Sequence, residues 1–421
     1  MAGAAAHRAA AALEKIPDRQ SVVPGPGAAA AAGAGEMTAD ETTKSRAADL
    51  PAIVLISQSE WGLAWVFAHD LARHFTESGH PVVFLNPFPK RFPRPGEWRR
   101  LLGRLLDRPR LTHFVNHPRP SGLSIITPLT LPDRNRLFTW MNRRFFLPWL
   151  KKKVLTSCGC SEQRLVFVFL PFATPVALAD MLAPFCLVYA RRDGYDDDPG
   201  LRHLNSRQGE LLQRADLIIT AGQILAAKCR VQEHKVLDIP GLVDFSEFFR
   251  PVIEQALAEP LCCYFGHVNE RVDLPLLLRV GQRYRLRIIG RLSVDWPAGS
   301  GAEIVGMVPR DRLPELLAAA DIVVIPYRLT GFSRSIFPYK IFQAFAQGKP
   351  VVATRLPALE PLAHLLYLAS SAEEFLEMIA RAANEGSEVK LRRQEMARQH
   401  DRCTVLESLR LRLLGIDGSP Q

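Results

Sequence analysis

The stretch FPYKIFQAFAQGKPVVAT in the last third of the chain has the residue types and spacing of a phosphate-binding segment. It predicts a helix over 338–347 that begins at a proline, ends at Gly348 and leads directly into an apolar strand. The first N–H groups of such a helix have no partner within it and form the positive end of its dipole. Lys340 falls in the first turn, where a cation is unfavourable unless an anion lies beside it. We therefore expect a diphosphate at this helix end; the alternative is a lysine whose ammonium group reaches solvent.

A second candidate reactive group, Asp193, follows a predicted strand at 185–189. The carboxyl ends of strands in α/β sheets carry ligands and reactive side chains, so Asp193 could act on a bound substrate. The alternative is that it is solvated together with the acidic run Asp196–Asp198. That run imitates the paired carboxylates that hold a divalent metal at a diphosphate. The run precedes a Pro-Gly turn and lies in the other half of the chain from Lys340. Both features favour a solvated turn, so we expect no metal site.

The cysteines and the known short motifs exclude several classes of protein. The chain has seven cysteines, an odd number, and no paired spacing that could hold zinc. Cys158 and Cys160 supply only two ligands and are expected to be ordinary thiols in a reducing compartment. No Gly-x-Ser-x-Gly or His-Glu-x-x-His sequence occurs, so neither hydrolase mechanism has support.

The elements that must position these groups alternate between short apolar strands and helices from residue 51 onward. In the first half, strands are predicted at 52–57, 81–85, 122–126, 165–169, 185–189, 216–220 and 236–239, with helices at 61–76 and 174–182. In the second half, strands are predicted at 261–266, 285–290, 304–306, 321–327 and 350–354, with helices at 271–280, 311–320, 338–347 and 372–383. This alternation is typical of parallel sheets covered by helices. We therefore expect an α/β protein with two Rossmann-like halves around a cleft.

Five segments resemble the bacterial branch of retaining glycosyltransferases with the GT-B fold. The phosphate-binding segment resembles the donor helix of that family, which reads roughly Pro-Leu-Lys-Leu-Phe-Glu-Tyr-Met-Ala-Ala-Gly-Lys-Pro-Val-Val. The other segments are GHVNERVD from Gly266, DRLPELLAAAD from Asp311, ELLQRADLIIT from Glu210 and IPGLVD from Ile239. The resemblance covers residues 51 to about 385, strongly in the second half and loosely before residue 160. It implies the GT-B fold, in which the parallel sheets of two Rossmann-like domains face a central cleft.

The resemblance also implies which residues bind and react. Lys340 and Arg271 would contact the diphosphate of a nucleotide-sugar, so that two cations stabilise the departing nucleoside diphosphate without a metal. For Arg271 the alternative is an ion pair with Glu270 or Asp273 on a helix surface. The family keeps an aspartate where Asp193 stands, which implies a catalytic role on the acceptor side. Further donor-binding positions implied by the two motifs are Gly266, His267, Asn269, Tyr339 and Gln343.

Two positions depart from the family pattern. Gln343 replaces a glutamate that accepts both ribose hydroxyls, and Ser335 replaces a glutamate found in some members eight positions earlier. The glutamine carbonyl still accepts one hydrogen bond, but the negative charge is lost. The alternative to an enzyme is therefore a non-catalytic GT-B-like scaffold or regulatory protein with a weakened donor site.

The positive charge of the chain is concentrated in one segment. Lys and Arg number 53 against 43 Asp and Glu, a net charge of +10. Residues 86–153 hold 16 Lys and Arg and three acids, so this segment carries +13 and the rest of the chain −3. Within it, 96–110 and 137–153 combine Trp, Phe and Leu with cations, as do helices that bind an anionic membrane surface. The alternative is that both helices pack their apolar faces on the first sheet. No nucleic acid is expected, because no binding-module signature occurs.

These observations predict the domain organisation and the function. We expect a disordered Ala-rich tail at 1–50, an N-terminal Rossmann-like acceptor and membrane-facing domain at 51–245, a C-terminal Rossmann-like nucleotide-sugar domain at 246–385, and a C-terminal helix at 386–421 that packs back on the N-terminal domain. Three prolines in the apolar stretch 165–190 argue against a transmembrane helix. The expected function is metal-independent, retaining transfer of a sugar from a UDP- or GDP-sugar to a lipid-linked or polysaccharide acceptor. The protein is expected to be cytoplasmic, peripheral on the inner face of the cell membrane, and to need no cofactor.

Overall fold

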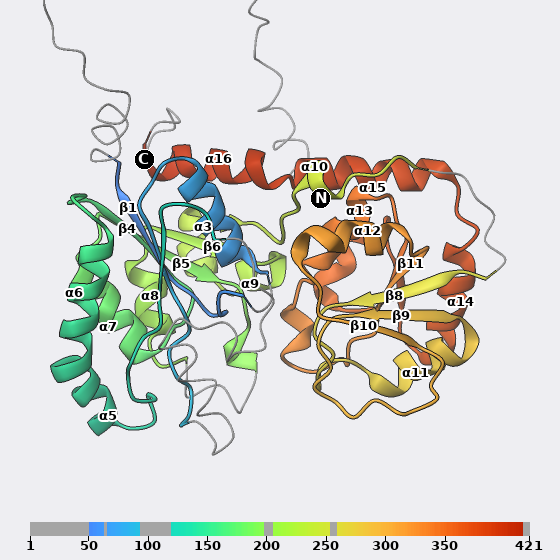
Figure 1. The fold of residues 1–421 in the computed structure, drawn as a ribbon, viewed down its shortest axis with the longest axis horizontal. Helices are drawn as coiled ribbons and strands as arrows, with labels where there is room; N and C mark the ends of the chain where they lie inside the picture. Colours follow the sequence, from blue (N-terminus) through green and yellow to red (C-terminus); the bar gives the residue numbers. More distant parts are fainter. Residues whose placement is uncertain (1–49, 63–64, 93–118, 198–204, 253–258, 416–421) are drawn as a thin grey trace, which may run out of the picture. The chain divides into compact units, whose positions relative to one another are not determined.

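The computed structural model describes residues 50–62, 65–92, 119–197, 205–252 and 259–415 (Figure 1). The predicted tail, apart from its last residue, and the predicted helix at 96–110 lie outside the described residues. The described part is built from two parallel sheets covered by helices.

The first sheet has seven strands in the order β3-β2-β1-β4-β5-β6-β7, and all neighbouring pairs are parallel. The strands are β1 (Ala52–Ile56), β2 (Val82–Leu85), β3 (Leu123–Ile126), β4 (Arg164–Val168), β5 (Cys186–Arg191), β6 (Leu217–Thr220) and β7 (Val236–Asp238). Successive side chains of a strand point to opposite faces. Val54 and Ile56 accordingly pack in one core cluster, and Ile53 and Leu55 pack in the other.

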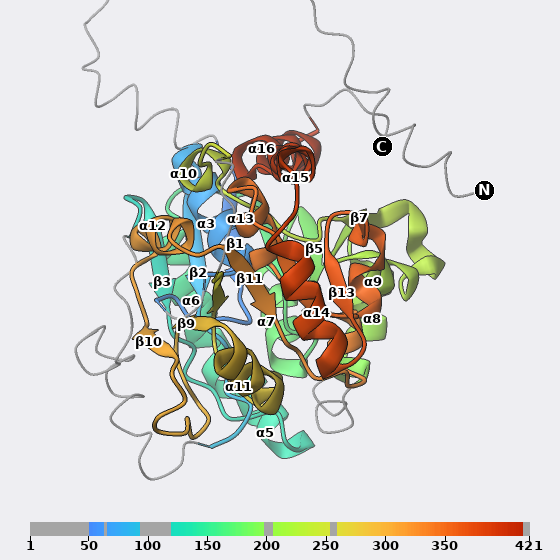
Figure 2. The same cartoon turned by 90° about the vertical axis from the view of Figure 1, so that its right-hand side faces the viewer.

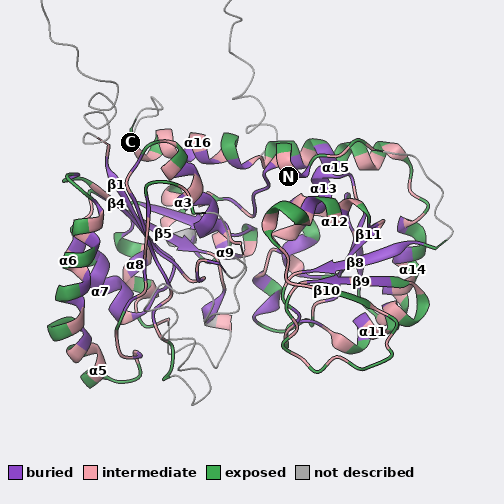
Figure 3. Ribbon diagram, in the orientation of Figure 1, coloured by how far each residue is buried: buried purple, intermediate pink, exposed green. Residues whose placement is uncertain are grey.

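Helices cover both faces of the first sheet. The helices α6 (Leu147–Ser157), α7 (Ala173–Leu182) and α8 (Gln208–Arg214) contribute Leu150, Leu178 and Leu211 to the core of one face. The helices α3 (Phe67–Glu77) and α16 (Arg402–Leu413) contribute Leu71 and Leu406 to the other. The inner strands β1, β2, β5 and β6 are accordingly buried along their length, as Figure 3 shows for β1 and β5, whereas the edge strands β3 and β7 are partly exposed.

The second sheet has six strands in the order β10-β9-β8-β11-β12-β13, again all parallel. The strands are β8 (Leu261–Phe265), β9 (Arg285–Ile289), β10 (Glu303–Gly306), β11 (Ile322–Ile325), β12 (Val351–Thr354) and β13 (Tyr367–Ala369). The helices α11 (Leu274–Arg283) and α14 (Ala372–Ala382) cover one face (Figure 2). The helices α12 (Leu313–Ala318), α13 (Lys340–Ala346) and α15 (Ser387–Gln399) pack on the other.

Shorter elements complete the described chain. They are α5 (Arg136–Met141), the π-helical turn η3 (Asn142–Phe146), α9 (Gln223–Ala227), α10 (Phe245–Phe248) and the 3-10 turns η4 (Tyr195–Asp197), η6 (Arg230–Lys235), η7 (Arg310–Arg312), η8 (Ser333–Ser335) and η9 (Pro357–Leu362).

The two sheets share one topology, and that topology locates their ligand-binding edges. In each, the chain runs outward from a central strand to one edge and then returns to continue on the other side. The order therefore reverses between β1 and β4 in the first sheet and between β8 and β11 in the second. Doubly wound sheets bind ligands beyond the carboxyl ends of the strands at this switch point.

Several elements differ from the prediction. The helix expected at 61–76 begins at Phe67, and β13 was not predicted. The helix predicted at 338–347 spans 340–346, so its proline lies before the helix. The expected C-terminal helix is two helices, because Asp401 starts α16 anew by accepting hydrogen bonds from two backbone N–H groups of its first turn.

Candidate functional site

Lys340 is the first residue of α13, and its ammonium group lies at the carboxyl ends of β8 and β11. Its Nζ donates to the backbone carbonyl of Phe265, the last residue of β8. It lies 4.1 Å from the ring centroid of Tyr264 and 5.6 Å from that of Tyr327, which follows β11. The lysine therefore occupies the switch point of the second sheet, where this topology binds ligands.

Two glycines bring backbone close to this ammonium group. Gly266 has a φ of +122°, and a Cβ there would lie 2.9 Å from Lys340 Nζ. Gly290 follows β9 with a φ of +139°, and a Cβ there would lie 2.1 Å from the carbonyl oxygen of Gly266. Both values are shorter than van der Waals contact, and both φ angles favour glycine. The loop after β8 therefore fits between β9 and the lysine only without side chains at these two positions.

Arg271 extends the same loop with a second cation. Asn269 Oδ1 accepts a hydrogen bond of 3.0 Å from the Arg271 N–H, and the guanidinium carbon lies 4.5 Å from the ring centroid of Phe332. Among the described residues neither Glu270 nor Asp273 forms an ion pair with it, and Asp273 instead caps α11. An exposed arginine stacked on a ring keeps its planar set of donors for an anionic ligand.

His267, in the same loop, contacts two polar side chains. Its Nε2 lies 2.7 Å from Ser293 Oγ, and its Nδ1 lies 3.4 Å from Asn269 Nδ2. Desolvation by the surrounding protein, and then the charge of Arg291, lowers the pKa of His267. The imidazole is therefore neutral at neutral pH and adds no charge to the site.

Asp193 lies just beyond β5, and the structure places beside it a lysine that the sequence analysis did not single out. The Nζ of Lys90, which follows β2, lies 5.4 Å from the ring centroid of Tyr195 and 5.8 Å from that of Phe172. The Tyr195 hydroxyl donates to Asp193 Oδ2 at 3.5 Å. Desolvation lowers the pKa of Lys90; the charge of Asp193 opposes this shift and that of Arg271 adds to it. Lys90, Asp193 and Tyr195, which follow strands of the first sheet, therefore lie close together.

The two positions that depart from the family pattern have different surroundings. Ser335 is buried, and its hydroxyl donates to Asp197 Oδ2 at 3.3 Å. Asp197 also forms an ion pair with Lys228 at 2.5 Å. Gln343, one turn after Lys340, is half-buried, and its amide makes no hydrogen bond within the described ranges. The Ser335 hydroxyl is therefore bound by a residue of the first half of the chain, whereas the Gln343 amide has no hydrogen-bond partner among the described residues.

The two cysteines of the Cys158-Gly-Cys160 sequence differ in exposure. Cys158 is buried and Cys160 is exposed, and burial raises the pKa of Cys158 to about 11. No group of three or more His, Cys, Asp or Glu side chains that could hold a metal occurs in the described part of the chain. Within that same part, no helix has the length and apolar character needed to cross a membrane.

The predicted segment 137–153 lies within α5, η3 and α6, and the apolar side chains of these elements differ in burial. Leu147, Leu150 and Val154 pack in the core of the first sheet, as the packing alternative predicts. Four others remain exposed at the surface, namely Leu137, Trp140, Phe145 and Trp149. Each of these four exposes at least 50% of its surface, far more than packing on the sheet would leave. The segment therefore carries an exposed aromatic surface beside the cations of its own helices, which we call the α5–α6 face.

Comparison with known proteins identifies the fold and one matched segment. Residues 270–385 match the sequence family Glycosyl transferases group 1. The putative teichuronic acid biosynthesis glycosyltransferase TuaH of Bacillus subtilis (strain 168) is 38% identical over 47 residues. That stretch spans 11% of this chain and only 12% of that relative's length.

Solved structures resemble nearly the whole chain. Anabaena HepE in complex with UDP and glucose has a TM-score of 0.56 at 15% identity, covering 86% of this chain and 99% of that one. The lipopolysaccharide outer core galactosyltransferase WaaB in its apo form has a TM-score of 0.55 at 11% identity, with coverage of 86% and 99%. An α,α-trehalose-phosphate synthase (UDP-forming) from Burkholderia vietnamiensis has a TM-score of 0.55 at 11% identity, with coverage of 87% and 99%. These proteins have the GT-B fold, and the fold predicted for this chain is confirmed.

Proposed function

We propose that this chain, a GT-B protein with a glycosyl transferase group 1 segment, moves a sugar from a nucleotide-diphosphate sugar to a lipid-linked or polysaccharide acceptor. The observation that carries the proposal is the position of Lys340 at the switch point of the second sheet, against the side-chain-free backbone of Gly266. A cation fixed there can balance the charge that grows on a departing diphosphate. The UDP bound to HepE supports UDP as the donor nucleotide, with GDP as the second candidate.

The proposed mechanism uses only groups of this chain. Lys340 and Arg271 bind the diphosphate oxygens and stabilise the nucleoside diphosphate as the bond to the sugar breaks, without a metal or cofactor. The acceptor binds beside Asp193, where Lys90 adds a positive charge. The family resemblance supports retention of the anomeric configuration.

Calorimetry distinguishes the proposed enzyme from the alternative of a non-catalytic scaffold. The purified chain is titrated with UDP and with GDP, and one of them is expected to bind with a dissociation constant below a millimolar. Hydrolysis or transfer of the matching sugar nucleotide then tests turnover. Heat from neither nucleotide at millimolar concentration would favour the scaffold.

Gln343→Glu is expected to tighten UDP binding about tenfold. The carboxylate accepts hydrogen bonds from both ribose hydroxyls, and hydrogen bonds to a charged group are roughly twice as strong as neutral ones. The control is a diphosphate of 2′,3′-dideoxyuridine, which lacks both hydroxyls and should gain nothing from the substitution. Equal gains for the two ligands would show that Gln343 does not face the ribose.

We propose further that the α5–α6 face attaches the protein peripherally to the inner face of the cell membrane. Trp140 and Phe145 pack edge to face at 5.9 Å, and the Arg144 guanidinium lies 5.7 Å from the Phe145 ring centroid. Lys153 lies over Trp149 at 5.4 Å. Aromatic side chains paired with cations suit the boundary between lipid headgroups and acyl chains.

Removing the aromatic side chains of this face is expected to release the protein from anionic liposomes. The triple substitution Trp140→Ala, Phe145→Ala, Trp149→Ala should lower co-sedimentation with phosphatidylglycerol vesicles about tenfold or more. Because these side chains are exposed, the thermal midpoint should stay within a few degrees of wild type. Equal binding of the wild-type protein to neutral and anionic vesicles would argue against an electrostatic contribution.

A further inference from the structure

Asp70 is a buried carboxylate of the domain built on the first sheet, called the first domain below. It binds Tyr339, the residue that precedes Lys340. Its Oδ1 accepts a hydrogen bond of 2.7 Å from Trp65 Nε1, and its Oδ2 accepts one from the Tyr339 hydroxyl. The side chain is 3% exposed, so these donors replace the water that a carboxylate otherwise binds. Asp70 also lies in the first turn of α3, where the helix dipole favours a negative charge. One acceptor group thus joins α3 of the first domain to the start of α13.

The Tyr339 side chain belongs to the core of the first domain although its backbone begins the donor helix. Its ring packs against the cluster that contains Phe67, Leu71 and Leu242. A Cβ on Gly241 would lie 3.7 Å from Tyr339 Cδ2, which places the ring against the segment between the domains. The family resemblance implies a donor-binding role for Tyr339, but its hydroxyl is already bound by Asp70. The side chain therefore connects the domains, while the next residue lies at the donor site.

A second contact fixes Asp70 from the C-terminal domain. Arg310 Nη1 lies 3.7 Å from Asp70 Oδ1, and the guanidinium carbon lies 4.3 Å from the ring centroid of Trp65. Arg310 Nη2 also pairs with Glu247 at 3.0 Å. Burial raises the pKa of Asp70, and the charge of Arg310 opposes that shift most strongly. Asp70 is thus held by groups from both domains, and a small displacement of α13 would break its bond to Tyr339.

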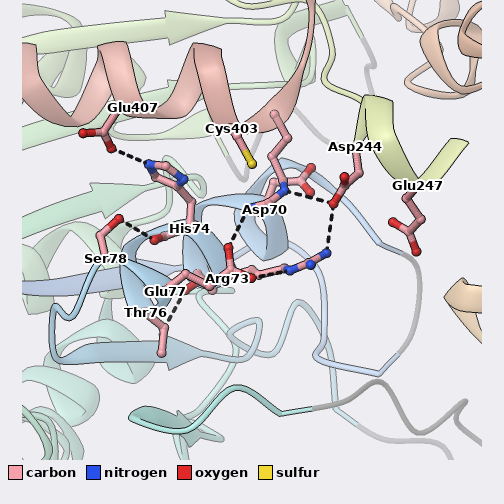
Figure 4. Close-up of polar contacts among 12 residues, drawn as sticks. Asp70, Arg73, His74, Thr76, Glu77, Ser78, Asp244, Glu247, Cys403 and Glu407 are labelled. Carbon is pink, nitrogen blue, oxygen red and sulfur yellow. Dashed lines mark hydrogen bonds and ion pairs between the residues drawn. The ribbon is translucent and has the colours of Figure 1, made fainter. Parts of the chain in front are cut away.

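The remaining charges of this region hold α3 to α16 rather than to α13. Arg73 pairs with Glu77 at 2.7 Å and with Asp244 at 3.1 Å. Arg402 of α16 pairs with Glu77 at 3.1 Å and with Asp244 at 3.5 Å. Figure 4 shows Asp70, Arg73 and Glu77 along α3 with Asp244 beside them. Glu77 therefore shares the helix of Asp70 and joins it to α16, and among the described residues it forms no ion pair with α13.

We propose that Asp70 is a positioning residue for donor binding: through the Tyr339 hydroxyl it holds the start of α13 so that the Lys340 ammonium stays at the ends of β8 and β11. The inference rests on the proposed donor site at Lys340. It predicts that the first domain controls nucleotide affinity without contacting the nucleotide.

The test compares variants of the full chain by UDP calorimetry. Tyr339→Phe removes one hydroxyl and keeps the packed ring, and it should weaken UDP binding about tenfold. Asp70→Asn should have a similar effect, because its amide cannot accept from both Trp65 and Tyr339. The double variant should be no weaker than either single variant, since both remove one interaction. Glu77→Gln is the matched control and should leave the affinity within about twofold while lowering the thermal midpoint.

Hydrogen exchange gives a readout that needs no ligand. The amides of 339–342 should exchange at least several-fold faster in Tyr339→Phe than in wild type, whereas those of β9 should not change. Unchanged exchange and unchanged UDP affinity in Tyr339→Phe would refute the positioning role. A loss of affinity as large in Glu77→Gln would also refute it, because general weakening of the contacts that hold α3 would then explain the effect. If wild type binds no UDP or GDP but the exchange result holds, the donor assignment fails and the contact between Asp70 and α13 stands.

Discussion

Lys340→Met is expected to weaken UDP binding about a hundredfold and to abolish sugar transfer. A charge-assisted hydrogen bond contributes about 1.5–3 kcal/mol, and each 1.4 kcal/mol is a factor of ten in affinity. Methionine keeps an unbranched apolar stem against the rings of Tyr264 and Tyr327, so the substitution removes the charge and preserves the packing. Calorimetry with UDP measures the affinity, and thermal unfolding checks that the fold is retained.

Lys349→Met provides the matched control for that substitution. Lys349 lies just beyond the other end of α13 and donates to the carbonyls of Ala318 and Ala320. Like Lys340, it is a partly buried lysine that donates to backbone carbonyls, and burial lowers its pKa. Its loss should lower the thermal midpoint without changing UDP affinity. Similar affinity losses in the two variants would mean that Lys340 acts through stability and not through the diphosphate.

The sheets could be predicted from sequence because strand and helix periods are local. Runs such as AIVLI in β1 and IVVI in β11 are continuous apolar segments bounded by turns, which is the pattern of strands buried on both faces. The edge strand β13 has three residues, too few to show any period. The apolar spacing before α3 continues back to Trp61, but Val66 has extended backbone with a φ of −138°, and the helix begins after it. Element type was thus better determined than element ends.

The residues of the candidate site also differ in how well the sequence predicts them. Lys340, Gly266 and Arg271 belong to short motifs whose spacing is visible along the chain. Lys90 had only a weak signal, its position just after a predicted strand at the same sheet edge as Asp193. The pairing of Asp70 with Tyr339 spans 269 positions and depends on how two domains meet, which no local pattern records. The sequence also could not show which aromatic residues of 137–153 pack inward, because the π-helical turn at Asn142–Phe146 shifts the helical phase.

Gly290→Ala is expected to destabilise the C-terminal domain by about 3 kcal/mol or more and to lower UDP affinity as well. The new Cβ would lie 2.1 Å from the carbonyl oxygen of Gly266, and a backbone atom cannot move aside as a flexible side chain can. The φ of +139° adds strain for any L side chain. The thermal midpoint should fall by roughly 6–12 °C. In protein that remains folded, the loop after β8 must shift toward Lys340, so the donor site changes with it.

Gly299→Ala separates the clash from the backbone strain. Gly299 has a φ of +75°, and no described atom lies within 4 Å of the position that an alanine methyl group would take, so alanine there carries conformational strain alone. We expect a cost of about 1 kcal/mol and no change in UDP affinity. A Gly290→Ala protein no less stable than Gly299→Ala would mean that the loop after β8 relaxes freely. In that case Gly266 would not hold its backbone in place against Lys340, and the close contact at the centre of the proposed donor site would not be a requirement of the fold.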